Sequence, residues 1–254
     1  MMDTMLASVR AEVAQSAVAS GSEPLLAVRD LHAYYGESHI LHGMTFDVRP
    51  GEVVTLLGRN GAGKTTTMRA IVGMVKNRSG SVRFDGHELV GMRSDRIARR
   101  GVAYCPEERG IFASLNVTEN LLLPPVIKPG GMTLDEIYQL FPRLKERGAS
   151  QGTKLSGGEQ QMLAIARILR TGAKFLLLDE PTEGLAPVFV EHIGAIIQSL
   201  KTRGFTILLV EQNFHFAASV ADRHYVVEHG AVIDTFDNRE LTANKTKLEG
   251  YLGV

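Results

Sequence analysis

The chain is organised around Gly58-Arg59-Asn60-Gly61-Ala62-Gly63-Lys64-Thr65, which Thr66 follows. The stretch has the form G-x-x-x-x-G-K-[ST], in which glycines allow successive backbone N–H groups to curl around a phosphate. In that form the lysine reaches the outer phosphates and the hydroxyl after it ligates Mg²⁺. A glycine-rich turn alone would not require lysine and threonine at these offsets. The stretch therefore predicts a phosphate loop with contacts from Gly58, Arg59, Asn60, Gly61, Ala62, Gly63, Lys64, Thr65 and Thr66.

The segments around this loop predict the strand and the helix that such a loop needs. Residues 53–57 form an apolar run of strand length, and residues 66–72 predict a helix whose positive N-terminal end points at the phosphates. Two further apolar runs, residues 175–178 and 206–210, show no polar alternation, which indicates strands covered on both faces. These patterns predict an α/β fold with a mainly parallel sheet.

Other segments predict additions to this core. Short strand-like pieces at residues 25–28, 44–48 and 81–84 predict a small antiparallel β layer beside the main sheet. Between about residues 111 and 170, apolar residues fall at helical spacing and prolines punctuate the chain, which predicts a helical insertion. We expect residues 1–24 to be a disordered N-terminal extension.

Composition excludes some partners and leaves others open. Across the 254 residues, 28 Lys and Arg balance 28 Asp and Glu, so the net charge gives no reason to expect a nucleic-acid partner. Cys105 is the only cysteine and cannot form an internal disulfide. No uninterrupted apolar run approaches the roughly 18 residues that span a bilayer, so we expect any membrane association to use a protein partner or a surface contact.

Two acidic residues follow one of the buried runs. Asp179 and Glu180 come directly after residues 175–178, at the carboxyl end of a strand expected beside the phosphate loop. There one carboxylate can hold Mg²⁺, and the other can orient or deprotonate an attacking water. Taken alone, the pair could simply cap a strand end. Beside a phosphate loop it predicts a hydrolytic site.

A second motif opens the last helix of the insertion. In Leu155-Ser156-Gly157-Gly158-Glu159-Gln160-Gln161, which we term the signature stretch, Ser156 and Glu159 have the spacing of a capping box. Capping does not explain Gly157 and Gly158, since glycine lowers helix stability. We expect these glycines to allow a ligand or another backbone to approach the start of the helix closely.

Three motifs therefore occur in one order: the phosphate loop, the signature stretch and Leu178-Asp179-Glu180-Pro181. From Leu25 onward the chain resembles the ATP-binding subunits of ABC transporters, which are P-loop NTPases. The resemblance implies a single ABC ATPase domain at residues 25–254, with an antiparallel β subdomain and a helical subdomain at about 111–170. It also implies ATP and Mg²⁺ as the bound groups.

The resemblance implies a head-to-tail dimer that sandwiches two ATP molecules. Each would lie between the phosphate loop of one subunit and Ser156, Gly157, Gly158 and Glu159 of the other. A helix N-terminus is a suitable second anion site. Lys64 would hold the β- and γ-phosphates and Thr65 would ligate Mg²⁺. Asp179 would support the metal, Glu180 would be the general base, and Tyr35, or else Tyr34, would stack on the adenine.

Two positions depart from the general ABC pattern. Most ABC ATPases have a glutamine that reaches Mg²⁺ and the attacking water, and this chain has Glu107 there. Where a switch histidine usually contacts the γ-phosphate, this chain has Gln212, which can donate a hydrogen bond but carries no charge. His215 lies three residues further on, and we interpret it as a structural or surface histidine.

These departures resemble one subfamily, the shorter ATPase of branched-chain amino-acid importers. The resemblance rests on Cys105-Pro106-Glu107, Leu209-Val210-Glu211-Gln212-Asn213, Glu183-Gly184-Leu185-Ala186-Pro187 and Tyr251-Leu252-Gly253-Val254. It implies a second, different ATPase subunit, two membrane permeases and, indirectly, a periplasmic binding protein. It further implies a peripheral place at the cytoplasmic face of the bacterial inner membrane, with residues 107–123 expected to dock the permease.

Other functions share parts of this pattern. Related ATPases serve urea uptake, short-chain amide uptake or lipopolysaccharide export. A soluble ABC ATPase that acts on ribosomes or DNA usually has two ATPase units or a long coiled coil, and this chain shows one set of motifs. A subunit that binds ATP for regulation is a third alternative, against which Glu180 argues.

Overall fold

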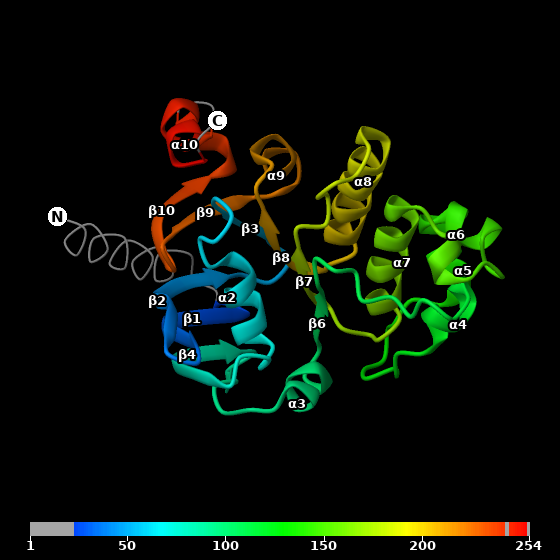
Figure 1. Ribbon diagram of the computed structural model, residues 1–254, viewed down its shortest axis with the longest axis horizontal. Coiled ribbons are helices and arrows are strands. Elements are labelled where there is room, and N and C mark those ends of the chain that lie inside the picture. Colours follow the sequence, from blue (N-terminus) through cyan, green and yellow to red (C-terminus); the bar gives the residue numbers. More distant parts are fainter. Residues whose placement is uncertain (1–22, 242–243, 253–254) are drawn as a thin grey trace.

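The computed structural model describes residues 23–241 and 244–252, which form two sheets with helices around them (Figure 1). The predicted N-terminal extension, residues 1–24, lies outside the described residues except for Glu23 and Pro24. The C-terminal motif at residues 251–254 lies outside them in its last two positions.

The main sheet has six strands in the order β10-β9-β3-β8-β7-β6. All neighbours run parallel except β9 and β10, which confirms the predicted mainly parallel sheet. The C-terminal hairpin, β9 and β10, joins this sheet because β9 pairs with β3. The strands are β3 (Val53–Leu57), β6 (Val102–Cys105), β7 (Phe175–Asp179), β8 (Thr206–Glu211), β9 (Arg223–Glu228) and β10 (Ala231–Asp237).

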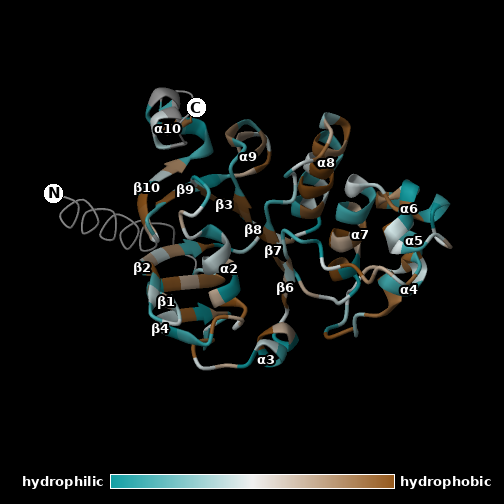
Figure 2. Cartoon of the chain, viewed as in Figure 1, coloured by the Kyte–Doolittle hydropathy of each residue, from teal (hydrophilic) through white to brown (hydrophobic). Residues whose placement is uncertain are grey.

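Alternate residues of the central strands pack into cores on the two faces of the main sheet. Leu177 belongs to one hydrophobic cluster, and its neighbours Leu176 and Leu178 belong to the other. Side chains of a strand point alternately to its two faces, so apolar residues at every position are needed where both faces are covered. Figure 2 shows this hydrophobic character along β7 and β8. The uninterrupted apolar runs of the sequence therefore have the expected cause.

The second sheet is antiparallel, in the order β2-β1-β4-β5, and confirms the predicted β layer. Its first strands are longer than predicted because β1 continues past an irregularity at Asp30, whose φ is +48°. The register shifts between Val28 and Leu31, so the polar residues there interrupt the alternation without ending the strand. The strands are β1 (Leu26–Tyr35), β2 (Ser38–Val48), β4 (Asn77–Phe84) and β5 (His87–Glu88).

The predicted helical insertion is confirmed, and its helices α4 to α7 gather on the right in Figure 1, away from the antiparallel sheet. No helix in the described ranges has the length and apolar character needed to cross a membrane. The helices are α2 (Lys64–Ile71), α3 (Ser94–Arg99), α4 (Val117–Leu122), α5 (Leu134–Leu140), α6 (Pro142–Glu146), α7 (Gly157–Leu169), α8 (Pro187–Thr202), α9 (Phe214–Val220) and α10 (Lys245–Leu252), with 3₁₀ segments η1 (Gly152–Lys154) and η2 (Asn238–Glu240).

Candidate functional site

The phosphate loop joins β3 to α2 and packs against the turn between β9 and β10. A Cβ on Gly58 would lie 2.3 Å from the carbonyl oxygen of Val227, so only glycine fits there. Gly230 N donates a hydrogen bond of 2.8 Å to the carbonyl of Ala62. Gly63 has a φ of +106°, a conformation that favours glycine. The loop is therefore a cradle that side chains would fill.

Lys64 begins α2, two residues earlier than the predicted helix start, and its side chain is 3% exposed. Its Nζ donates to the carbonyl oxygens of Gly58 and Arg59, at 2.8 and 3.0 Å. The same Nζ lies 3.2 Å from Oε1 of Glu180. No side chain caps α2 at Gly63. A buried ammonium, a glycine cradle and an uncapped helix start together fit an anionic phosphate group.

Asp179, the last residue of β7, links the phosphate loop to the neighbouring strand. Its Oδ1 accepts a hydrogen bond of 3.0 Å from Thr65 Oγ1, and its Oδ2 accepts one of 2.8 Å from the Tyr104 hydroxyl. Burial raises the pKa of Asp179 to about 6, against the opposing effect of these two hydrogen bonds. A hydroxyl and a carboxylate at this distance are oxygen donors of the type that Mg²⁺ prefers.

Glu180 lies next to both the lysine and the switch position. Its Oε2 accepts a hydrogen bond of 2.7 Å from Gln212 Nε2, while Oε1 faces Lys64. The side chain is 8% exposed, and the backbone φ of +45° is unusual for a residue other than glycine. Backbone strain of this kind is found where the surrounding contacts over-determine one geometry.

Further carboxylates converge on the same edge of the sheet. Glu107 follows β6, is exposed, and its charge adds to the rise in the pKa of Asp179. Partial burial, with the charges of Glu180 and Glu107, raises the pKa of Glu183. Four acidic groups thus repel one another here, and a divalent cation would relieve that repulsion. The residues present therefore fit Mg²⁺, with Thr65, Asp179 and Glu107 as candidate ligands.

The two tyrosines at the end of β1 differ in their surroundings. Tyr34 stacks on His39, with ring centroids 4.2 Å apart and planes 12° apart. Tyr35 is 46% exposed and contacts Arg69 of α2, the helix that follows the phosphate loop. Because one face of Tyr34 is already covered, Tyr35 is the better candidate for stacking on a base.

The signature stretch forms the predicted capping box at the start of α7. Ser156 Oγ accepts from Glu159 N at 3.3 Å, and Glu159 Oε2 accepts from Ser156 N at 2.8 Å. A Cβ on Gly158 would lie 2.3 Å from the ring of Phe189 in α8. The close neighbour that explains this glycine is therefore a side chain of the same chain. A Cβ on Gly157 would meet only Arg109, at 3.4 Å.

The structure does not bring the signature stretch to the phosphate loop. In Figure 1, α7 lies among the insertion helices, separated from α2 by β6 and β7. Ser156 is exposed. The candidate residues thus form two groups on one chain: Lys64, Thr65, Glu107, Asp179, Glu180 and Gln212 in the first, and Ser156, Gly157, Gly158 and Glu159 in the second.

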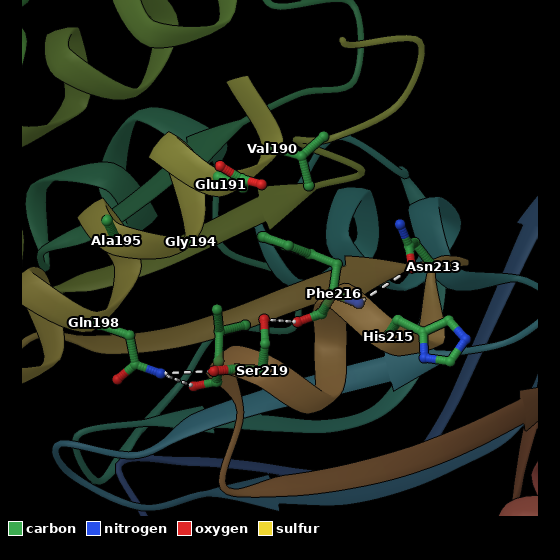
Figure 3. Close-up of a pocket in the computed structure, with 10 residues that line it drawn as sticks. Val190, Glu191, Gly194, Ala195, Gln198, Asn213, His215, Phe216 and Ser219 are labelled. Atoms are coloured by element: carbon green, nitrogen blue, oxygen red, sulfur yellow. Dashed lines mark hydrogen bonds between the residues drawn. The ribbon is translucent and has the colours of Figure 1, made fainter. Parts of the chain in front are cut away.

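His215 lies away from the carboxylates, as expected for a surface histidine. It is exposed on α9 and borders a groove of about 500 Å³ between α8 and α9 (Figure 3). Its ring contacts that of Phe214, with centroids 5.7 Å apart. In the same groove Asn213 caps α9 by accepting from Phe216 N at 3.1 Å.

Several residues of the site were missed by sequence reasoning. Tyr104 holds Asp179, Thr182 donates to Glu211, and Phe189 packs on the signature stretch. Tyr104 brings a polar hydroxyl into the apolar strand β6, one residue before its end, and Glu211 ends β8 with a charge. These polar groups could have indicated the missed contacts, because a polar group in a buried strand needs a hydrogen-bond partner.

A family model described as ABC transporter matches residues 41–183. The chain belongs to the ABC transporter family. It is an ABC-type ATPase whose ATP hydrolysis is coupled to transport, which confirms the predicted family, fold class and enzyme class.

Individual ABC proteins are similar to this chain over most of its length. The chain is 42% identical over 232 residues to BraG of Pseudomonas aeruginosa, a high-affinity branched-chain amino acid transport ATP-binding protein; the match covers 90% of this chain and 100% of that one. It is 33% identical to LptB of Escherichia coli, a lipopolysaccharide export system ATP-binding protein, over 90% of this chain and 97% of that one.

Solved structures of ABC ATPases share the fold. A structure described as the ATP-binding subunit of an ABC transporter aligns with a TM-score of 0.75 and 28% identity, over 91% of this chain and 100% of that one. A nucleotide-free ATP-binding cassette aligns with a TM-score of 0.78 and 24% identity, over 91% and 99%. The second match shows the fold alone.

Proposed function

We propose that this chain is the ATP-hydrolysing subunit of a branched-chain amino-acid importer, and that it works in a head-to-tail ATPase dimer beneath two membrane permeases. The observation that carries the dimer is the separation of the phosphate loop from the exposed Ser156 at the start of α7. The similarity to BraG supports the cargo class. In this proposal the chain lies at the cytoplasmic face of the bacterial inner membrane, with a binding protein as an indirect partner.

The residues of the first group divide the work at the nucleotide. The backbone of residues 58–66 and Lys64 would hold the phosphates, and Thr65, Asp179 and Glu107 would hold Mg²⁺. When bound, Mg²⁺ neutralises charge on the phosphate oxygens. Glu180 accepts a proton from the attacking water, and Gln212 orients Glu180 by the hydrogen bond that already joins them.

Because Lys64 and Glu180 form an ion pair, nucleotide binding would precede the release of Glu180 to act as the base. Phosphate oxygens that bind in the loop compete with Glu180 for the ammonium of Lys64. Since Gln212 holds the other oxygen of Glu180, the carboxylate keeps a defined position when Lys64 turns to the phosphates. Nucleotide binding thereby frees the proposed base beside its substrate.

The proposed permease contact is the surface at residues 107–123. Phe112 is 48% exposed there, and the guanidinium of Arg167 lies 5.3 Å from its ring centroid. The fully buried Asn120 fixes this loop, because it accepts from Phe112 N at 2.8 Å and donates to Phe112 O at 3.0 Å. A rigidly held, exposed aromatic residue is a suitable anchor for a partner. Leu122, Leu123 and Val126 add exposed apolar surface nearby.

The test is reconstitution of the chain with its second ATPase, two permeases and binding protein in lipid nanodiscs. We expect leucine, isoleucine or valine with the binding protein to stimulate ATP hydrolysis, and Phe112→Asp to release the chain from the complex while Phe112→Leu retains it. Stimulation by lipopolysaccharide, urea or short-chain amides instead would reassign the cargo. Failure to recover any permease would overturn the transport complex, and stimulation by nucleic acid would favour a soluble ABC ATPase.

A further inference from the structure

The site contains a buried carboxylate with no part in the functions proposed above. Glu211, the last residue of β8, is 2% exposed and pairs with Leu57 of β3, directly before the phosphate loop. A buried acid lowers stability unless its oxygens are satisfied. Glu211 lies beside the start of the phosphate loop and directly before Gln212, so contacts there must compensate its burial.

Both oxygens of Glu211 have partners in the loops that carry Glu180 and Gln212. Oε1 accepts a hydrogen bond of 2.8 Å from Thr182 Oγ1, and Oε2 faces the backbone N of Asn213 at 3.4 Å. Thr182 is two residues beyond Glu180, and Gln212 is the residue after Glu211. The Thr182–Glu211 contact thus joins the loop after β7 to the loop after β8.

The loop after β7 needs such a restraint. Glu180 has a φ of +45°, and its N donates to Val210 O at 3.0 Å while its carbonyl accepts from Glu183 N at 3.2 Å. This tight turn holds the Glu180 side chain between Lys64 and Gln212. An unfavourable backbone conformation persists only where its surroundings impose it. Thr182 lies inside that turn and is 7% exposed.

From this geometry we infer that Glu211 is a positioning residue for ATP hydrolysis, acting through Thr182 to hold the strained turn at Glu180 in register with Gln212. The inference rests on the proposed role of Glu180 as the base. Burial raises the pKa of Glu211 to about 7, and the nearby Glu180 adds to that rise. A protonated Glu211 accepts the same hydrogen bond from Thr182 without placing a further negative charge beside Glu180.

The test compares Thr182→Val with Thr55→Val in the assembled transporter. Thr55 is another buried threonine, whose Oγ1 lies 2.6 Å from His224 Nδ1, so its replacement also removes a buried hydroxyl contact. We expect Thr182→Val to lower kcat about tenfold with the KM for ATP nearly unchanged, because small displacements of a reacting group are costly. Thr182→Ser should restore the rate, and Thr55→Val should destabilise the fold while leaving kcat within about twofold.

A second pair of variants tests the carboxylate itself. Glu211→Gln keeps an acceptor for Thr182 and should retain kcat within about threefold, while Glu211→Met removes it and should match Thr182→Val. Because the two residues act together, the double variant Thr182→Val with Glu211→Met should be no slower than the slower single variant. Equal kcat losses in Thr55→Val and Thr182→Val, or an undiminished kcat in Glu211→Met, would overturn the inference.

Hydrogen exchange in the isolated chain separates this inference from the proposed function. The amides of Glu180 and Glu183 should exchange faster in Thr182→Val than in Thr55→Val, with no ATP hydrolysis required. If this difference appears but replacement of Glu180 leaves turnover intact, the positioning contact stands and the assignment of the base fails. If the two variants exchange alike at these amides, the positioning role itself is wrong.

Discussion

The functional side chains on the phosphate-loop side and on the signature side of this molecule are held in place by different kinds of contact. Lys64, Asp179 and Glu180 are 3%, 1% and 8% exposed, and contacts with segments far apart in sequence hold all three. Ser156 is exposed, and it caps its own helix by accepting a hydrogen bond from Glu159 N. The phosphate-loop residues are held by contacts across the fold, whereas Ser156 is held by capping within its own helix. Because this cap forms within one helix, a second chain could bind the exposed start of α7 without breaking contacts elsewhere in the fold.

The largest expected effect comes from a change on the phosphate-loop side. Glu180→Gln should lower ATP hydrolysis by about 10²-fold or more, since general base catalysis contributes about that much. ATP binding should persist, because the phosphate loop is unchanged. The measurement is single-turnover hydrolysis together with nucleotide retention in the assembled complex. Glu191→Gln, an exposed glutamate on α8, is the control, and undiminished turnover in Glu180→Gln would remove Glu180 from the chemistry.

The next effect tests whether Ser156 does more than cap its helix. Ser156→Asn keeps a good N-cap but replaces the hydroxyl by a larger carboxamide, and we expect turnover to fall about tenfold while thermal stability changes little. Ser156→Thr keeps both features and should stay near the wild-type rate. Ser156→Ala should lose turnover and about 1 kcal/mol of stability. Parallel measurements of kcat and unfolding separate these cases, and full activity in Ser156→Asn would reduce the residue to a structural cap.

A smaller effect concerns the two signature glycines. Gly158→Ala should lower the free energy of unfolding by about 1–3 kcal/mol, because its new methyl group meets the Phe189 ring. Gly157→Ala meets only the flexible end of Arg109 and should be nearly neutral. Denaturant titration of the two variants measures the difference. Equal stabilities would show that α8 can move away from α7 at little cost.

The smallest effect is the pH dependence that Asp179 contributes to folding. Its folded-state pKa of about 6 lies above the ordinary value of 3.8, so the folded chain binds this proton more tightly than the unfolded chain. The free energy of unfolding therefore gains from Asp179 as the pH falls from above 6 toward 4, and charged Asp179 costs stability at neutral pH.

We accordingly expect Asp179→Asn to raise the free energy of unfolding at pH 7.5 by on the order of 1–2 kcal/mol, with less gain at pH 5. Chemical denaturation at both pH values measures this, with Asp135→Asn on α5 as a control for the loss of a charge. A variant that is less stable than wild type at pH 7.5 would mean that the hydrogen bonds from Thr65 and Tyr104 outweigh the cost of burial.

The sequence predicts those parts of the site whose residues are contiguous. The phosphate loop and the Asp179–Glu180 pair have fixed offsets to a buried run, so strand, loop and carboxylates follow from local patterns. Contacts such as Tyr104 to Asp179 or Phe189 to Gly158 depend on which strands and helices become neighbours. Local propensity carries no such information, which is why these partners were missed.

The limits of the predicted fold have the same origin. The length of β1 was underestimated because an irregularity at Asp30 breaks the alternating pattern without ending the strand. The C-terminal hairpin gave no sign that β9 would lie beside β3, since that pairing spans most of the chain. The domain limits and the roles of all the candidate site residues, Glu107 and Gln212 among them, stay predictions.

The left-handed backbone of Glu180 has a consequence for how this protein responds to selection. Glycine and asparagine adopt such a φ more readily than glutamate, so either substitution should relieve strain at this position. Each would also remove the carboxylate. A selection for thermal stability that ignores activity should therefore favour substitutions at residue 180 and yield proteins that are more stable but inactive. Here stability and turnover compete for a single residue.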